Sequence, residues 1–178
     1  MDEDQSYPDH SGRFSDWFQV LSRESLTGRC YWEVEWSGEW ARIAVSYKDI
    51  QRKGSFDECL FGNNDKSWAL ICNKHSYLFR SSLISSSPVS GPVSGPTSSR
   101  IGVYLDHSAG VLTFYSVSES TISLIHRCQT TFTEPLYAGF GTSHFNTQHQ
   151  LHRGLQHREL DNEPGSYESS NKTCSRGR

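Results

Sequence analysis

Hydrophobic and polar residues alternate along much of this chain, and the clearest example is the segment 28–36. Trp32, Val34 and Trp36 alternate there with Glu33 and Glu35. This period of two is typical of a β-strand with one buried face and one solvated face. Two tryptophans place a large apolar surface on one side of a single strand. We therefore expect the tryptophan face of this segment to lie in a hydrophobic core.

The same pattern predicts several further short strands. Segments 42–47 and 122–126 alternate, whereas segment 68–72 is almost wholly apolar, as in a strand buried on both faces. Strands are also expected at 20–22, 77–79, 100–106, 111–117 and 136–141, with a turn at 25–28. Gly110 can take a positive φ in the turn 107–110, which makes 100–117 the clearest hairpin. Without a long helical pattern, the sequence predicts an all-β sandwich or barrel.

The chain of 178 residues divides into one predicted domain and three polar segments. Residues 14–145 hold the strands, and residues 1–13 form a flexible lead-in. Residues 81–99 are rich in Ser, Pro and Gly and repeat Pro-Val-Ser-Gly at Pro88–Gly91 and Pro92–Gly95, which predicts a flexible loop lengthened by duplication. Residues 146–178 are polar and charged and are predicted to be a disordered tail.

Composition argues against several classes of protein. The net charge of −3 does not indicate nucleic-acid binding. No apolar run reaches the roughly 18 residues of a membrane span, and the acidic, polar N-terminus is unlike a signal peptide. The five cysteines are widely spaced without a CxxC pair, so we expect buried thiols at Cys30, Cys72 and Cys128 in a reducing cytoplasm.

Candidate catalytic and metal-binding chemistry is weak. Among the eight histidines, His149 and His152 could share a helix face, but the neighbouring Arg153 would oppose a bound metal. The sequence contains no GxSxG, HExxH, Walker or GxGxxG motif. We therefore predict that the protein is not an enzyme and has no catalytic residue, no metal site and no cofactor.

Four blocks of sequence occur in an order that resembles the B30.2 or PRY-SPRY domain. They are Arg13-Phe14 with Val20-Leu21 and Gly28–Trp36, then Ile43–Tyr47 with Arg52–Gly54, then Ser67–Leu70 through Asn73-Lys74, and then Arg100–Asp106 with Gly110 and Leu112–Tyr115. Pro135–Phe140 resembles the closing strand of the family, and together these segments cover about residues 7–145. The amino-acid sequence of these blocks is similar to that of SPRY domains of fish NOD-like receptors, tripartite-motif-like proteins and stonefish cytolysin subunits. The resemblance implies a bent sandwich of two antiparallel sheets that binds proteins through loops at one end. Only the last portion of the PRY part, residues 14–27, matches.

Trp40 is the strongest candidate for partner binding, because it follows a polar turn and exposed tryptophans are favoured at binding hot spots. A core residue at the edge of the sheet is the alternative. Arg42 and Arg80 could pair with acidic groups of a partner, and the region around residues 73–77 is where family members often contact ligands. The remaining candidates, for which ordinary surface is the alternative, are Asn63, Asp65, Lys66, Asn73, Lys74, His75 and Tyr77.

Three hypotheses for function follow. The favoured one is a non-enzymatic module that recognises a protein or peptide in innate immunity or ubiquitin-ligase-type signalling. The second is an accessory domain of a pore-forming toxin similar to the stonefish subunits, which would place the protein outside the cell. The third is a truncated fragment that does not fold alone, because the upstream PRY strands do not match.

Overall fold

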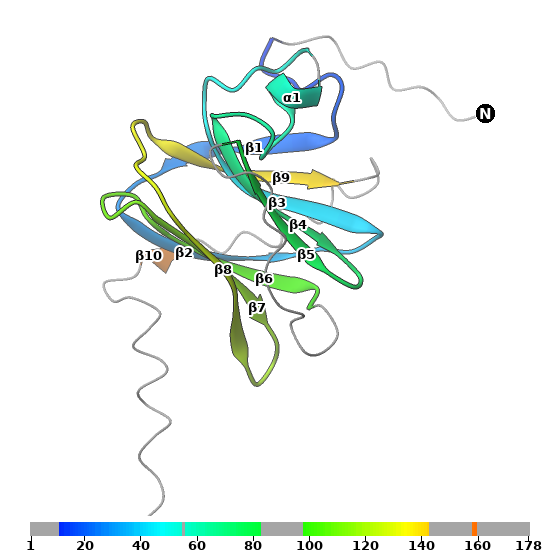
Figure 1. Cartoon of the computed structure of the whole chain (residues 1–178), viewed down its shortest axis with the longest axis vertical. Helices are drawn as coiled ribbons and strands as arrows, with labels where there is room; N and C mark the ends of the chain where they lie inside the picture. The colour runs from blue at the N-terminus through cyan, green and yellow to red at the C-terminus, as the bar shows by residue number, and fades with distance from the viewer. Residues whose placement is uncertain (1–10, 55, 83–97, 143–157, 160–178) are drawn as a thin grey trace, which may run out of the picture.

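The structure, a computed structural model, describes residues 11–54, 56–82, 98–142 and 158–159, and it consists of two facing antiparallel sheets (Figure 1). The first sheet runs in the order β1 (Gln19–Leu26), β9 (Leu136–Thr142), β3 (Trp40–Tyr47), β4 (Ser67–Asn73) and β5 (Tyr77–Ser81). The second contains β2 (Arg29–Glu35), β6 (Arg100–Asp106), β7 (Val111–Val117) and β8 (Ile122–Gln129), with the two-residue β10 (Arg158–Glu159) paired to β2. The predicted all-β sandwich is confirmed.

The main core lies between the two sheets. Trp32, Val34 and Trp36 of β2 are all buried in it, as their alternation predicts. Trp68 of β4 is the largest fully buried side chain, and its ring meets Tyr47 and Phe132 edge-on at centroid distances of 5.4 and 5.0 Å. Edge-to-face contacts of this kind suit the quadrupoles of aromatic rings.

A second, smaller core lies on the outer face of the first sheet. The segment that follows β3 carries the single-turn helix α1 (Phe56–Cys59) and crosses this face (Figure 1). Phe61 packs there against Phe14 at a centroid distance of 5.4 Å, together with Ala44, Ile50 and Ala69. The centre of β3 is therefore buried on both faces, although its sequence resembles a strand with one wet face.

The hairpin between β6 and β7 forms as predicted, with Gly110 at φ 70°. The main-chain nitrogen of Thr130 donates to the oxygen of Gly110 at 2.8 Å, so the turn also anchors the chain after β8. The strand expected at 20–22 is longer than predicted, because β1 pairs with β9 as far as Leu26 through a bulge. The turn predicted at 25–28 is therefore wrong in its first two residues.

Cys30, Cys72 and Cys128 are buried free thiols, which confirms the prediction, and Cys59 is buried as well. No helix in the described part of the chain is long and apolar enough to cross a membrane. Most of the segments predicted to be flexible, at 1–13, 81–99 and 146–178, lies outside the described residues, as do His149 and His152.

Candidate functional site

Strands β3, β4 and β5 bring several of the predicted binding residues onto the outer face of the first sheet. Trp40 lies opposite Asn73, and Arg42 lies opposite Ile71. Arg80 of β5 lies opposite Ala69, whose side chain belongs to the outer core. Because directly opposed residues share a face and alternate residues along a strand point the same way, all of these side chains lie on one surface.

Trp40 is partly exposed at the first position of β3. The turn before it contains Gly38 at φ 101°, a conformation that glycine adopts without steric cost. Trp40 is thus neither a fully buried core residue nor a fully solvated one. A partly exposed indole next to a turn can present both an apolar surface and an N–H donor to a partner.

The turn between β4 and β5 lies beside Trp40 and is held by Asn73. The Asn73 Oδ1 atom accepts hydrogen bonds from the main-chain nitrogens of His75 and Ser76 at 2.8 and 2.7 Å. Lys74 forms an ion pair with Glu39, with 2.8 Å between Nζ and Oε1. The exposed side chains of Lys74 and His75 therefore project from a turn whose backbone is fixed by its own hydrogen bonds.

Arg42 differs from the expectation of an exposed cation, because it is only 8% exposed. Its Nη1 atom donates to the main-chain oxygen of Phe61 at 2.5 Å, which ties β3 to the segment that covers it. Burial, with a smaller contribution from Arg80, lowers the pKa of Arg42 to about 10, so it stays charged at neutral pH. Arg42 therefore has a structural role, because it holds the segment around Phe61 against the first sheet.

Tyr77 also differs from the prediction, because it lies on the inner face of β5 and is 8% exposed. Its hydroxyl oxygen accepts a hydrogen bond from the main-chain nitrogen of Ser98 at 3.0 Å. Burial raises the pKa of the Tyr77 phenol. The residue belongs to the core, and its periodicity with Phe79, which is also buried, was the sequence signal for this.

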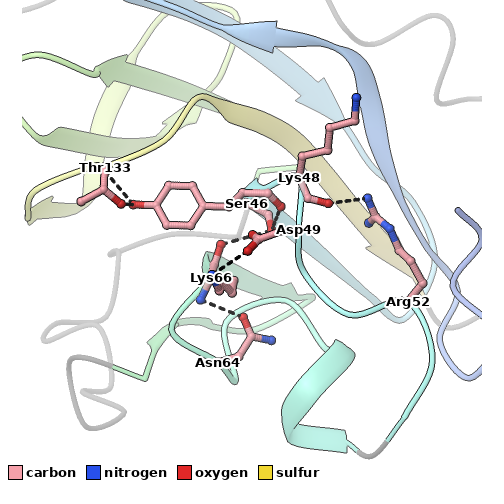
Figure 2. A network of polar contacts seen from close by, with 8 residues as sticks. Ser46, Lys48, Asp49, Arg52, Asn64, Lys66 and Thr133 are labelled. Atoms are coloured by element: carbon pink, nitrogen blue, oxygen red, sulfur yellow. Dashed lines mark hydrogen bonds and ion pairs between the residues drawn. The ribbon is translucent and has the colours of Figure 1, made fainter.

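Asp65 and Lys66 lie at the other end of β3 from Trp40, since Ser46 pairs with Ser67 whereas Trp40 pairs with Asn73. Lys66 forms an ion pair with Asp49, with 2.7 Å between Nζ and Oδ2 (Figure 2). Asn63 lies next to Arg80, which is on the same face of the sheet as Trp40. The Arg80 Nη1 atom donates a hydrogen bond to the Asn63 Oδ1 atom at 3.2 Å. The ten predicted residues therefore do not form one site.

Sequence reasoning missed two partly exposed apolar residues, Ile71 and Leu78, which are directly opposed across β4 and β5. The near-continuous apolar run at 68–72 suggested burial on both faces. Asn73, two residues after Ile71 and therefore on the same face, is the polar residue that indicates a solvent-exposed outer face. We call the surface formed by these side chains the β3–β5 face. Its members are Trp40, Asn63, Ile71, Asn73, Lys74, His75, Leu78 and Arg80.

Two observations on the described residues concern metal-binding and thiol chemistry. No three His, Cys, Asp or Glu side chains among them gather as metal ligands. Burial raises the pKa of the Cys72 and Cys128 thiols, which disfavours the nucleophilic thiolate. The β3–β5 face, an aromatic and two aliphatic residues beside cations and amides, suits binding better than bond-making chemistry.

Comparison with known proteins finds relatives that match about three quarters of this chain. The model of the SPRY domain matches residues 29–156. Stonustoxin subunit alpha of Synanceia horrida is 39% identical over 140 residues, which are 76% of this chain and 19% of that protein. Tripartite motif-containing protein 16 of Mus musculus is 36% identical over 139 residues, covering 77% of this chain and 24% of that protein.

Two solved structures resemble the fold. The stonustoxin structure superposes with a TM-score of 0.69 at 38% identity and covers 78% of this chain and 22% of that one. The crystal structure of the TRIM65 PSpry domain superposes with a TM-score of 0.59 at 27% identity and covers 72% of this chain and 65% of that one. The chain thus spans about a fifth of the length of the curated relatives it matches.

Proposed function

This chain belongs to the SPRY domain family, a family of protein-binding modules that are typically non-catalytic, and we propose that its β3–β5 face binds a protein or peptide partner. The observation that carries the proposal is the pairing of Trp40 with Asn73. It sets a partly exposed tryptophan beside a turn that Asn73 itself fixes. A rigid turn loses little conformational entropy when it binds, so more of the contact energy appears as affinity.

The composition of the face supports this role. Trp and Arg are the residue types most enriched at binding hot spots, and here Trp40 and Arg80 border the apolar pair Ile71 and Leu78. Lys74 and His75 add donors at the rim. A partner with an apolar side chain flanked by acceptors would complement this arrangement.

We propose that this module is part of a larger protein. We favour a tripartite-motif-like or NOD-like receptor parent that acts in innate immunity or ubiquitin-ligase-type signalling in the cytoplasm. The similarity to a tripartite motif-containing protein supports this choice, and the buried free thiols are compatible with a reducing compartment. Any catalytic output would come from other domains of such a parent.

The similarity to stonustoxin subunits supports a second candidate, an accessory domain of an extracellular pore-forming toxin. In that setting the β3–β5 face would contact another subunit of the toxin. Lysis of erythrocytes by the full-length parent would favour the toxin, whereas ligand-dependent signalling without lysis would favour the receptor or ligase.

The binding role is tested by capture from cell lysate with three forms of the whole chain: wild type, Trp40→Ala and Leu124→Ala. Leu124 is 59% exposed on the second sheet and serves as a matched apolar control. We expect wild type and Leu124→Ala to capture the same protein. When this protein is purified and titrated against each form of the chain, it should bind Trp40→Ala at least about tenfold more weakly than it binds wild type.

Thermal unfolding of the same proteins separates binding from folding. Trp40→Ala should lower the melting temperature by no more than about 4 °C, which is about 1 kcal/mol for a chain of this size. A large fall with unchanged affinity would show that Trp40 is a core residue. Absence of any cooperative transition in the wild-type chain would instead favour the truncated fragment.

A further inference from the structure

A second surface, a basic groove, lies along β1 and apart from the β3–β5 face. It is a half-open depression of about 410 Å³ between the segment before β1, the strand itself, the segment after β3 and Tyr137 of β9. Its lining includes the four cationic residues Arg13, Arg23, Lys48 and Arg52, and the described residues that line it include no Asp or Glu. β3 separates Lys48 from Trp40 by roughly 20–25 Å, so the two surfaces are distinct.

Arg52 is held in position by two contacts of its guanidinium group. The guanidinium carbon lies 4.5 Å from the centroid of the Phe14 ring, and Nη2 donates to the main-chain oxygen of Lys48 at 3.0 Å. The Nη1 atom is buried without a hydrogen-bond partner among the described residues. Burial also lowers the pKa of Arg52. A buried, charged donor without an acceptor is costly, so a local shift that let an anion reach Nη1 would remove that cost.

The nearby carboxylates are directed elsewhere. Asp49, which follows Lys48, pairs with Lys66, and the Lys48 side chain extends away from that pair (Figure 2). Asp16 accepts a hydrogen bond from the Ser15 hydroxyl at 2.9 Å. Among the described residues neither Lys48 nor Arg23 has an ion pair, and the Lys48 Nζ atom lies 5.7 Å from the centroid of the Tyr137 ring. The charges of Lys48 and Arg23 are therefore not neutralised by a carboxylate of the described residues.

The shape of the groove favours a peptide over a small anion. β1 pairs only with β9 among the described strands, so no described strand occupies its other edge, and its residues from Gln19 to Arg23 line the groove. An extended peptide can hydrogen-bond to such an edge while its side chains enter the neighbouring groove. Phe18 and Val20, exposed to 45% and 41%, offer apolar contacts beside the edge.

We propose that the basic groove along β1 binds an extended peptide segment with acidic or phosphorylated side chains, with Arg52, Lys48 and Arg23 pairing with its anionic groups. This site goes beyond the proposed β3–β5 face and uses none of its residues. A module with both sites would engage two segments of one partner or two partners at once.

The test uses the whole chain and fluorescence anisotropy with three labelled peptides of equal length: Glu-rich, phosphoserine-containing, and the same sequence with Gln. The groove variant is Arg23→Gln with Lys48→Gln, and the control is Arg29→Gln with Arg127→Gln. All four positions are exposed, and the two variants lose the same charge. We expect the groove variant to bind an anionic peptide at least about tenfold more weakly, while the control changes the affinity less than about twofold.

Arg52→Lys adds a sharper measurement, because it keeps the charge but removes the planar guanidinium. It should also weaken binding about tenfold, and if it fails to fold the groove variant alone decides.

Whether the Glu-rich or the phosphoserine peptide binds tighter distinguishes the two sources of negative charge. Equal losses in the groove variant and the control, tighter binding of an oligonucleotide of equal charge, or no binding of either anionic peptide would overturn the proposal. Trp40→Ala should leave this affinity unchanged, so the two sites can fail separately.

Discussion

Arg42 reaches from the middle of the first sheet to the main-chain oxygen of Phe61, which its Nη1 atom contacts at 2.5 Å. Phe61 in turn packs against Phe14 in the outer core. One side chain thus joins β3 to the segment that covers it and to the segment that precedes β1. The outer face of the first sheet and the basic groove, which Phe14 lines, are therefore connected through Arg42, Phe61 and Phe14.

Replacement of Arg42 by Met should therefore destabilise the protein. The variant keeps the length of the side chain but leaves the Phe61 carbonyl without its charged donor, which should lower the free energy of unfolding by about 2 kcal/mol. Arg100→Met is the matched control, because Arg100 pairs with the exposed Glu35 and such pairs contribute about 0–1 kcal/mol. Urea denaturation of both variants measures the difference. Equal losses would show that the Arg42 contact has no special weight.

Gly110 should tolerate no side chain. A Cβ atom there would lie 1.7 Å from the main-chain oxygen of Thr130, and the φ of 70° adds strain. Gly28 has a similar φ of 66°, but nothing lies within 4 Å of an added Cβ atom there. Gly28→Ala therefore measures the cost of the left-handed backbone conformation alone, which is about 1 kcal/mol. We expect Gly110→Ala to lose more than about 3 kcal/mol of unfolding free energy. Similar losses in both variants would mean that the chain around Thr130 moves aside freely.

The duplicated segment Pro88–Gly95 should be dispensable. It lies outside the described residues, within the connection from β5 to β6, and the end of that connection is anchored where Trp36 donates from its main chain to Ser99 at 2.8 Å. Loop-closure entropy depends only logarithmically on length, so removing these residues should change the stability by about 0.5 kcal/mol. A melting temperature within about 2 °C of wild type is expected. Loss of soluble protein would show that the repeat makes contacts the fold requires.

The strands were predictable from sequence because their signal is local. The alternation of Trp32, Val34 and Trp36 with glutamates needs only one buried face, and β2 has one. The hairpin at Gly110 was predictable for the same reason, since the turn depends on its own residues. In both cases the physical cause lies within a few positions of the effect.

The site was less predictable because it depends on contacts between distant segments. Nothing near Arg42 in sequence indicates that the carbonyl of Phe61 will lie beside it, so the residue resembled an exposed cation. Ile71 resembled core until the register with Leu78 placed it on the outer face. The basic groove likewise joins Arg23 to Lys48 only because β1 and the segment after β3 flank the same edge of the sheet.

His126 should make the stability depend on pH below neutrality. Its ring stacks on Phe79 at a centroid distance of 4.1 Å, and its Nε2 atom is buried without a hydrogen-bond partner among the described residues. Burial lowers the pKa of His126 below the ordinary value of 6.5, so the folded protein takes up a proton less readily than the unfolded chain. The unfolded state then binds more protons as the pH falls below about 6.5, and the free energy of unfolding decreases with it.

Urea denaturation of wild type, His126→Gln and His75→Gln between pH 5 and pH 8 checks this effect. The His126 contribution should be fully present above about pH 6.5 and should be lost as the pH falls through the lowered pKa of the folded state. His126→Gln should therefore be flatter than wild type over the acidic part of the range. His75→Gln removes an exposed histidine from the turn between β4 and β5 and serves as the control for the loss of one imidazole. An unchanged slope in His126→Gln would assign the pH dependence to other groups, because the stacked ring would then titrate alike in the folded and unfolded states.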